Sequence, residues 1–147
     1  MKSVHWLVLA SSTHSYIYEV EKQDYKLVKS LSHADSRLKT VDLDSDSEGK
    51  YRSDTSGQGQ YQAHTTSHEK EHQIFAHEIA AYLEKGRVDH QYQSLIICAE
   101  PHFYGLIESS IPKTVQTLIK KAIQKDYIPL SESERNHVIK AIILDNH

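Results

Sequence analysis

The chain has 147 residues, of which 38% are hydrophobic and 25% are charged, and its formal net charge is -3 at pH 7. These values exclude a wholly disordered chain and a chain that binds nucleic acid through bulk positive charge. A chain of this length buries roughly 68–70% of the surface that it exposes when unfolded. We therefore predict one domain over residues 1–147, with a real hydrophobic core, and no DNA partner.

The opening of the chain is predicted to be a strand rather than a targeting segment. The apolar run from Val4 to Ala10 is as short as the shortest signal-peptide core, and His5 interrupts it. No stretch approaches the roughly 20 apolar residues of a membrane helix. The single cysteine, Cys98, excludes an intramolecular disulfide framework and suits a reducing compartment. We expect a cytoplasmic protein with no membrane partner.

Three short strands are predicted at the start of the chain. The runs 4–10, 15–20 and 25–31 are rich in Val, Ile, Leu and Tyr, and short polar turns separate them. Strands joined by such short turns form an antiparallel meander.

The pattern changes from Ser32 to Thr65. This stretch is rich in serine and acidic residues and poor in large apolar ones, so we predict a long polar loop over about 32–65. Loops of this length inside a small domain are uncommon and are usually functional or disordered.

A helix is predicted next. Thr66 and Glu69 have the spacing of a capping box, and Gly86 is a plausible terminator. One face of this helix carries Phe75, Ile79, Tyr82 and Leu83. The continuous apolar run 95–99 then predicts a central strand covered on both faces, with Cys98 as a small core residue.

The last third of the chain alternates helix and strand. Residues 102–110 are predicted to form a short helix. Residues 115–125 fit both periods, because their apolar residues have helical spacing while Ile119, Lys121 and Ile123 alternate. Ser131 and Glu134 form a second capping box, which predicts a final helix with its isoleucines facing the core.

A His-Glu-x-x-His pattern lies at the start of the long predicted helix. His68 and His72 stand one turn apart on one helical face, as two ligands of one zinc ion do, and Glu69 is placed as a base for a metal-bound water. Such a site needs a third protein ligand, for which His64, His77 and His102 are candidates. The alternative is two partly buried histidines at a helix start.

Several segments, taken in order, resemble the bacterial host-attachment family, described as proteins required for attachment to host cells. These are the opening strand, the segment 46–50 (Asp-Ser-Glu-Gly-Lys, similar to the family's Asp-x-x-Gly-Arg), the stretch 95–101 and the Lys-Asp pair at 125–126. The resemblance spans nearly the whole chain. It implies a strand at about 118–124.

That family is similar to the middle domain of archaeal and eukaryotic peptide-chain release factors. The resemblance implies an α/β domain with a mixed sheet that starts with an antiparallel meander and carries helices packed on it. Release factors place a Gly-Gly-Gln loop before a helix, and segment 56–61 (Ser-Gly-Gln-Gly-Gln-Tyr) has a comparable position. Glycines allow close approach to the ribosomal centre, and the glutamine N–H stabilises developing charge. On this resemblance Gln58 and Gln60 are catalytic candidates.

Three functions follow from these observations. The first is a non-enzymatic binding or accessory protein of the host-attachment family, acting through a loop at about 42–61. Its predicted binding residues are Asp46, Gly49, Lys50, Gly57, Gln58, Gly59 and Gln60. The second is a ribosome-associated release or rescue factor that contacts ribosomal RNA or tRNA through Lys120, Lys121 and Lys125. The third is a zinc hydrolase using His68 and His72. Apart from that zinc, no cofactor is predicted.

Overall fold

The computed structural model describes residues 3–34 and 58–145, with residues 58–67 as backbone alone. Its five strands are β1 (Val4–Ala10), β2 (His14–Glu21), β3 (Asp24–Ser32), β4 (Ser94–Cys98) and β5 (Ile119–Ile123). Its named helices are α3 (Gln58–Val88), α4 (Pro101–Ser110), α5 (Lys113–Gln116) and α6 (Glu132–Asp145).

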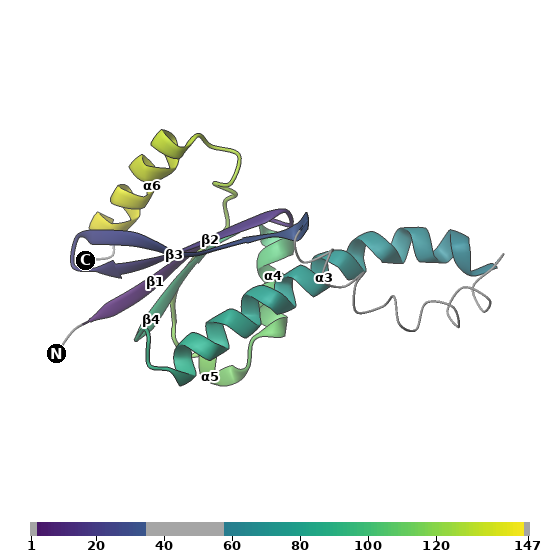
Figure 1. The fold of residues 1–147 in the computed structure, drawn as a ribbon, viewed down its shortest axis with the longest axis horizontal. Coiled ribbons are helices and arrows are strands. Elements are labelled where there is room, and N and C mark those ends of the chain that lie inside the picture. Colours follow the sequence, from purple (N-terminus) through teal and green to yellow (C-terminus); the bar gives the residue numbers. More distant parts are fainter. Residues whose placement is uncertain (1–2, 35–57, 146–147) are drawn as a thin grey trace.

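The strands form one open, mixed sheet in the order β3-β2-β1-β4-β5. The first three strands form the predicted antiparallel meander, and β4 and β5 lie parallel to β1. Figure 1 shows α3, α4 and α5 on one side of this sheet and α6 on the other. The prediction of a single mixed α/β domain is therefore confirmed.

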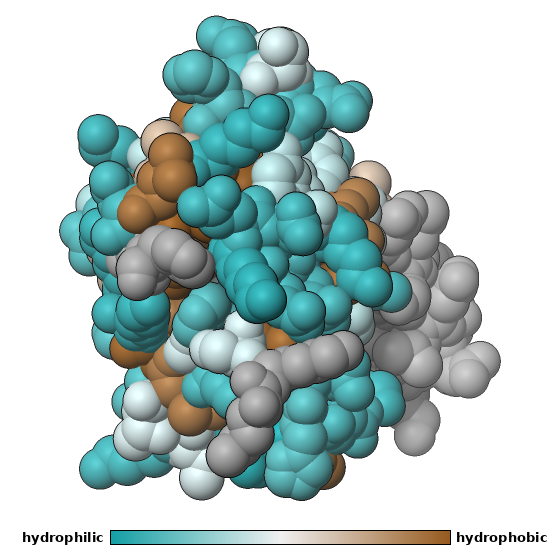
Figure 2. Space-filling view, turned by 90° about the vertical axis from the view of Figure 1, so that its left-hand side faces the viewer, coloured by the Kyte–Doolittle hydropathy of each residue, from teal (hydrophilic) through white to brown (hydrophobic). Residues whose placement is uncertain are grey.

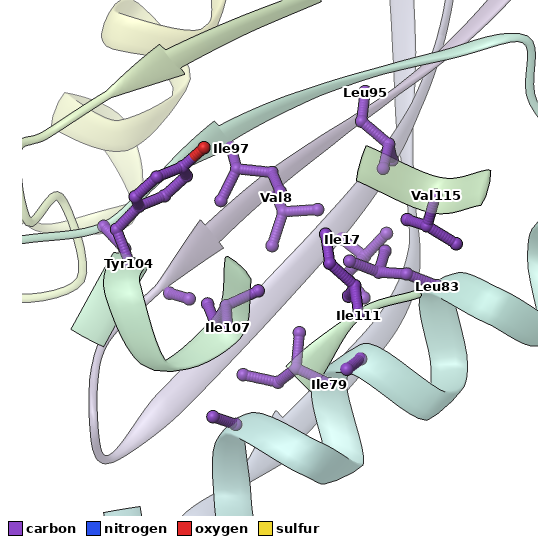
Figure 3. Close-up of a cluster of buried hydrophobic side chains, with 14 of the residues drawn as sticks. Val8, Ile17, Ile79, Leu83, Leu95, Ile97, Tyr104, Ile107, Ile111 and Val115 are labelled. Atoms are coloured by element: carbon purple, nitrogen blue, oxygen red, sulfur yellow. The ribbon is translucent and has the colours of Figure 1, made fainter. Parts of the chain in front are cut away.

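The central strand β1 is buried on both faces, which explains its continuous apolar run. Trp6 and Val8 face the helices α3, α4 and α5, whereas Leu7 and Leu9 face α6. Figure 3 shows how the first of these two cores fills the space between the sheet and its helices. Its side chains include Val8, Ile17, Ile79, Leu83, Leu95, Ile97, Ile107, Ile111 and Val115.

The second core lies under α6. Ile139, Ile142 and Ile143 of this helix are buried against the sheet. The predicted capping box opens the helix: Ser131 Oγ accepts from the backbone N–H of Glu134 at 3.2 Å, and Glu134 Oε1 accepts from that of Ser131 at 3.2 Å. The sequence therefore predicted both the start of this helix and its buried face.

The segment 115–125, which fitted both periods, contains a strand. Residues 119–123 form β5 at the margin of the sheet, and the helical spacing belongs in part to the short helix α5 just before it. The strand predicted from the family resemblance is thus confirmed. Pairing with β4 decides the conformation, and it places Ile119 against the first core and Ile123 against the second.

Two predicted boundaries of the long helix are wrong. The helix α3 begins at Gln58, so residues 58–65 of the predicted loop are helical and Thr66 lies inside the helix. Residues 58–67 contain no proline, and each further residue adds a backbone hydrogen bond to an existing helix. The apolar spacing begins only at Phe75, so it gave no signal for this upstream extension.

At its other end α3 continues to Val88, past the predicted terminator Gly86. The glycine is required for packing instead: an added Cβ at Gly86 would lie 2.5 Å from the Trp6 ring. Trp6 itself is buried between the rings of Tyr82 and Tyr92, at centroid distances of 5.3 Å and 4.7 Å. The glycine thus lets α3 approach the sheet at this point.

None of the helices in the described part of the chain combines the length and apolar composition that crossing a bilayer requires. Figure 2 shows the end of the molecule that carries both termini, where most side chains are hydrophilic and apolar ones form separate small areas. The large apolar side chains that are at least half exposed among the described residues are Leu27, Val88 and Leu144.

Candidate functional site

The candidate site lies where several strands end at the same edge of the sheet. The strands β1, β3 and β4 run in one direction, because β2 is antiparallel to both β1 and β3, and β4 is parallel to β1. His33 directly follows β3, and His102 is the second residue of α4, which follows β4 after a two-residue connection. The carboxyl edge of an open α/β sheet is a common place for ligand sites.

The helix α3 brings the His-Glu-x-x-His segment to this edge, where two of its glutamates contact two different histidines. Oε2 of Glu69 lies 3.3 Å from Nε2 of His102, and Oε2 of Glu71 lies 3.9 Å from Nε2 of His33. One ligand atom each from Glu69, His72 and His102 lies within 4.8 Å of the others. We call these three residues the His–Glu cluster.

The first histidine of the motif does not belong to this cluster. His68 is exposed, and the ligand atoms that the structure gathers come from Glu69, His72 and His102. The sequence pattern had assigned Glu69 the role of a base, whereas its carboxylate lies among the candidate ligands. His102 was one of three histidines considered for the third ligand, and only the packing of α4 against α3 places it here.

Two buried aromatic rings hold the cluster's backbone in place. Phe75 of α3 and Phe103 of α4 pack with their ring centroids 6.0 Å apart, and both are buried. His72 stands one turn before Phe75, and His102 directly precedes Phe103. The contact between the phenylalanines therefore fixes the distance between the two histidine-bearing helices.

The first turn of α4 has a second restraint. The carboxylate of Glu100 caps this helix by accepting from the backbone N–H groups of His102 at 3.3 Å and Phe103 at 2.8 Å. Capping satisfies donors that a helix start leaves unpaired. The backbone of His102 is thus held at the helix start while its side chain remains 59% exposed.

His33 is also held at this edge. Its backbone N–H donates to the carbonyl of Thr13 at 2.7 Å, which ties the end of β3 to the turn after β1. Its ring meets Phe75 edge to face at a centroid distance of 6.0 Å. The pair of His33 and Glu71 therefore lies next to the His–Glu cluster, on the same turn of α3.

The other predicted site residues lie elsewhere. Asp46, Gly49, Lys50 and Gly57 are outside the residues that the structure describes. Gln58, Gly59 and Gln60 are in the first turn of α3 rather than in a loop, and their binding or catalytic role stays a prediction. At 1.5 Å per residue, Gln58 lies about 16 Å along the helix from Glu69. These glutamines therefore do not join the cluster.

The three predicted RNA-contact lysines are exposed. Lys120 and Lys121 lie on β5, the marginal strand next to β4, and Lys125 follows it. Exposed lysines on an edge strand discourage pairing with the edge of another sheet. This role in the fold is sufficient to explain why lysines occupy these positions. The structure does not bring them to the His–Glu cluster.

Cys98 is a core residue and not a nucleophile. It is fully buried at the end of β4, and this burial raises the pKa of its thiol to about 12, although the charge of Lys121 acts in the opposite direction. Nucleophilic cysteines require a thiolate at working pH. The prediction that Cys98 is a small core residue is confirmed.

The raised pKa predicts that alkali destabilises the fold. An unfolded cysteine ionises near pH 8.5 while folded Cys98 keeps its proton, so the unfolded state binds fewer protons and stability falls as pH rises. We expect the free energy of unfolding to fall by up to about 1.4 kcal/mol per pH unit above about pH 9 through this group. Urea unfolding at about pH 8 and about pH 10 measures this slope, and Cys98→Ala should make it shallower. Equal slopes in both proteins would contradict the assignment.

Comparison with known proteins identifies the family. A search of curated proteins finds no match to the chain. The family model described as "Protein required for attachment to host cells" matches residues 6–137, which cover the sheet, the helices α3 to α5 and the first part of α6. This match confirms the family resemblance predicted from the sequence. The chain therefore belongs to the family of proteins required for attachment to host cells.

Proposed function

We propose that this protein is a non-enzymatic binding or accessory protein that cells need for attachment to a host. The observation that carries the proposal is the family match over residues 6–137.

We further propose that the segment 42–61 is the working surface. The chain leaves β3 at the carboxyl edge of the sheet before this segment, and residues 58–61 of the segment form the first turn of α3. The segment contains Asp46, Gly49 and Lys50, the residues that resemble the family's Asp-x-x-Gly-Arg pattern. Its acidic and glycine-rich composition supports polar contacts with a partner rather than a place in the core. The similarity to release-factor middle domains stays a prediction.

The role is tested by counting cells that attach to cultured host cells. Deleting the gene should reduce attachment, and the wild-type gene should restore it. The double variant Asp46→Asn, Lys50→Ala should fail to restore attachment, because it removes the two charges of the segment that resemble the family's Asp-x-x-Gly-Arg pattern. Lys140→Ala is the matched control, since this lysine is exposed on α6, on the other side of the sheet.

Each part of the proposal has its own contrary outcome. Normal attachment after gene deletion would refute the accessory role. Full restoration by the double variant would refute the working surface and leave the role intact. The variants must accumulate to the wild-type level and unfold at the same temperature, so that a failure to restore attachment reports on binding rather than on folding.

A further inference from the structure

We propose that Glu69, His72 and His102 form a binding site for a divalent transition-metal ion, with Zn²⁺ as the ion that fits the donors best. This site goes beyond the accessory role and does not depend on it. It also differs from the site indicated by the sequence pattern, because it uses Glu69 as a ligand and takes its second histidine from α4 instead of His68.

The donor set selects the class of ion. The cluster offers two imidazole nitrogens and one carboxylate oxygen. Imidazole suits Zn²⁺, Cu²⁺, Fe²⁺ and Ni²⁺, whereas Ca²⁺ and Mg²⁺ prefer sites made of oxygen alone. Three protein ligands of this kind leave one tetrahedral position of Zn²⁺ open for water or for a group from a partner.

The distances suit a small ion. Zn²⁺ binds imidazole nitrogen and carboxylate oxygen at about 2.0–2.2 Å, so neighbouring ligand atoms of a tetrahedral site lie roughly 3.3 Å apart. The Glu69 and His102 atoms are already 3.3 Å apart, and the whole group lies within 4.8 Å. His72 therefore needs to move by no more than about 1.5 Å to complete the site, which a side-chain rotation provides.

The surroundings allow this rotation while they hold the backbone still. The side chains of Glu69 and His102 are 44% and 59% exposed, so neither is locked by core packing. The spacing of Glu69 and His72 places both on one face of α3. The buried contact between Phe75 and Phe103 then holds the third ligand opposite them. A site whose ligand-bearing elements are rigid loses little entropy when it closes on an ion.

The experiment is a calorimetric titration of the untagged full-length protein with Zn²⁺, in the presence of excess Mg²⁺. We expect one saturable site per chain. Glu69→Gln, His72→Gln and His102→Gln should each weaken Zn²⁺ binding by more than about 10-fold, because even residues that only support a ligand contribute 10–100-fold to metal affinity.

Two control variants give the test its specificity in a chain with 11 histidines. His68→Gln removes the histidine that the sequence pattern requires but the geometry does not. His77→Gln removes an exposed histidine five residues beyond His72 on the same helix. Both should keep the wild-type affinity. Circular dichroism of all five variants should show unchanged helix content, since these positions are not part of the core.

Three results would overturn the proposal. The first is the absence of a saturable Zn²⁺ site in the wild-type protein. The second is full affinity in His102→Gln, which would show that α4 contributes no ligand. The third is a loss in His68→Gln as large as that in His72→Gln, which would assign the ion to the sequence pattern instead. None of these results bears on attachment, so the proposed function is tested separately.

Discussion

Replacing Phe75 with alanine should lower the free energy of unfolding by about 3–5 kcal/mol, the usual cost of removing a fully buried aromatic ring. Phe75 is 0% exposed and packs against Phe103 and the ring of His33. The substitution therefore leaves a cavity at the junction of α3, α4 and the end of β3. Since domains of this kind are stable by about 5–15 kcal/mol, the variant should be close to unfolding at 37 °C.

Chemical denaturation of wild type and variant measures the loss. Leu144→Ala is the control, because this side chain is 63% exposed and its truncation should change stability by no more than about 0.5 kcal/mol. Under conditions in which it stays folded, Phe75→Ala should also bind Zn²⁺ more weakly than the wild type, because Phe75 fixes the distance between His72 and His102. A loss below about 1 kcal/mol would show that the junction repacks without this ring.

Replacing Gly86 with alanine should destabilise the protein, although alanine is the better helix former. The added Cβ would lie 2.5 Å and 2.7 Å from two ring atoms of Trp6 and 3.0 Å from the ring of Tyr92. Trp6 has little freedom to yield, because it is buried and its ring is stacked against that of Tyr82. Overpacking costs about 1–3 kcal/mol and the gain in helix propensity is about 1 kcal/mol, so we expect a net loss of up to about 2 kcal/mol.

Gly105 provides a matched control within the same chain. It also lies inside a helix, α4, but an added Cβ there meets no atom within 4 Å. Gly105→Ala should therefore raise the free energy of unfolding by about 0.5–1 kcal/mol. Opposite signs for the two substitutions, measured by the same unfolding experiment, would establish that Gly86 is required by its contact with Trp6. A stabilising Gly86→Ala would contradict that conclusion.

The elements that the sequence predicted well are those whose local signals agree with their packing. The first strand is a continuous apolar run, and it is buried on both faces. The last helix has the Ser131 and Glu134 capping box and three isoleucines at helical spacing, and all of these features are present. In both cases a few consecutive residues contain the complete physical reason for the structure.

The prediction failed where a local signal had a different cause. Gly86 has the residue type of a helix terminator, but it is a glycine because Trp6 lies against it. Thr66 and Glu69 have capping-box spacing, yet the helix begins at Gln58. A capping-box pattern marks the start of a helix only if the residues before it are not helical. None of the residues from 58 to 65 is a proline, which would break the helix, so the helix extends upstream of the pattern.

The sequence by itself determined the α/β class, the meander, the final helix, the buried Cys98 and membership of the host-attachment family. These properties depend on the order and spacing of neighbouring residues. The tertiary structure decided that 119–123 is a strand, since pairing with β4 selects it over the helical alternative. It also decided which histidines meet. His72 and His102 are 30 residues apart in the sequence, and the packing of Phe75 against Phe103 brings them together. No spacing rule along the chain encodes a contact of that kind.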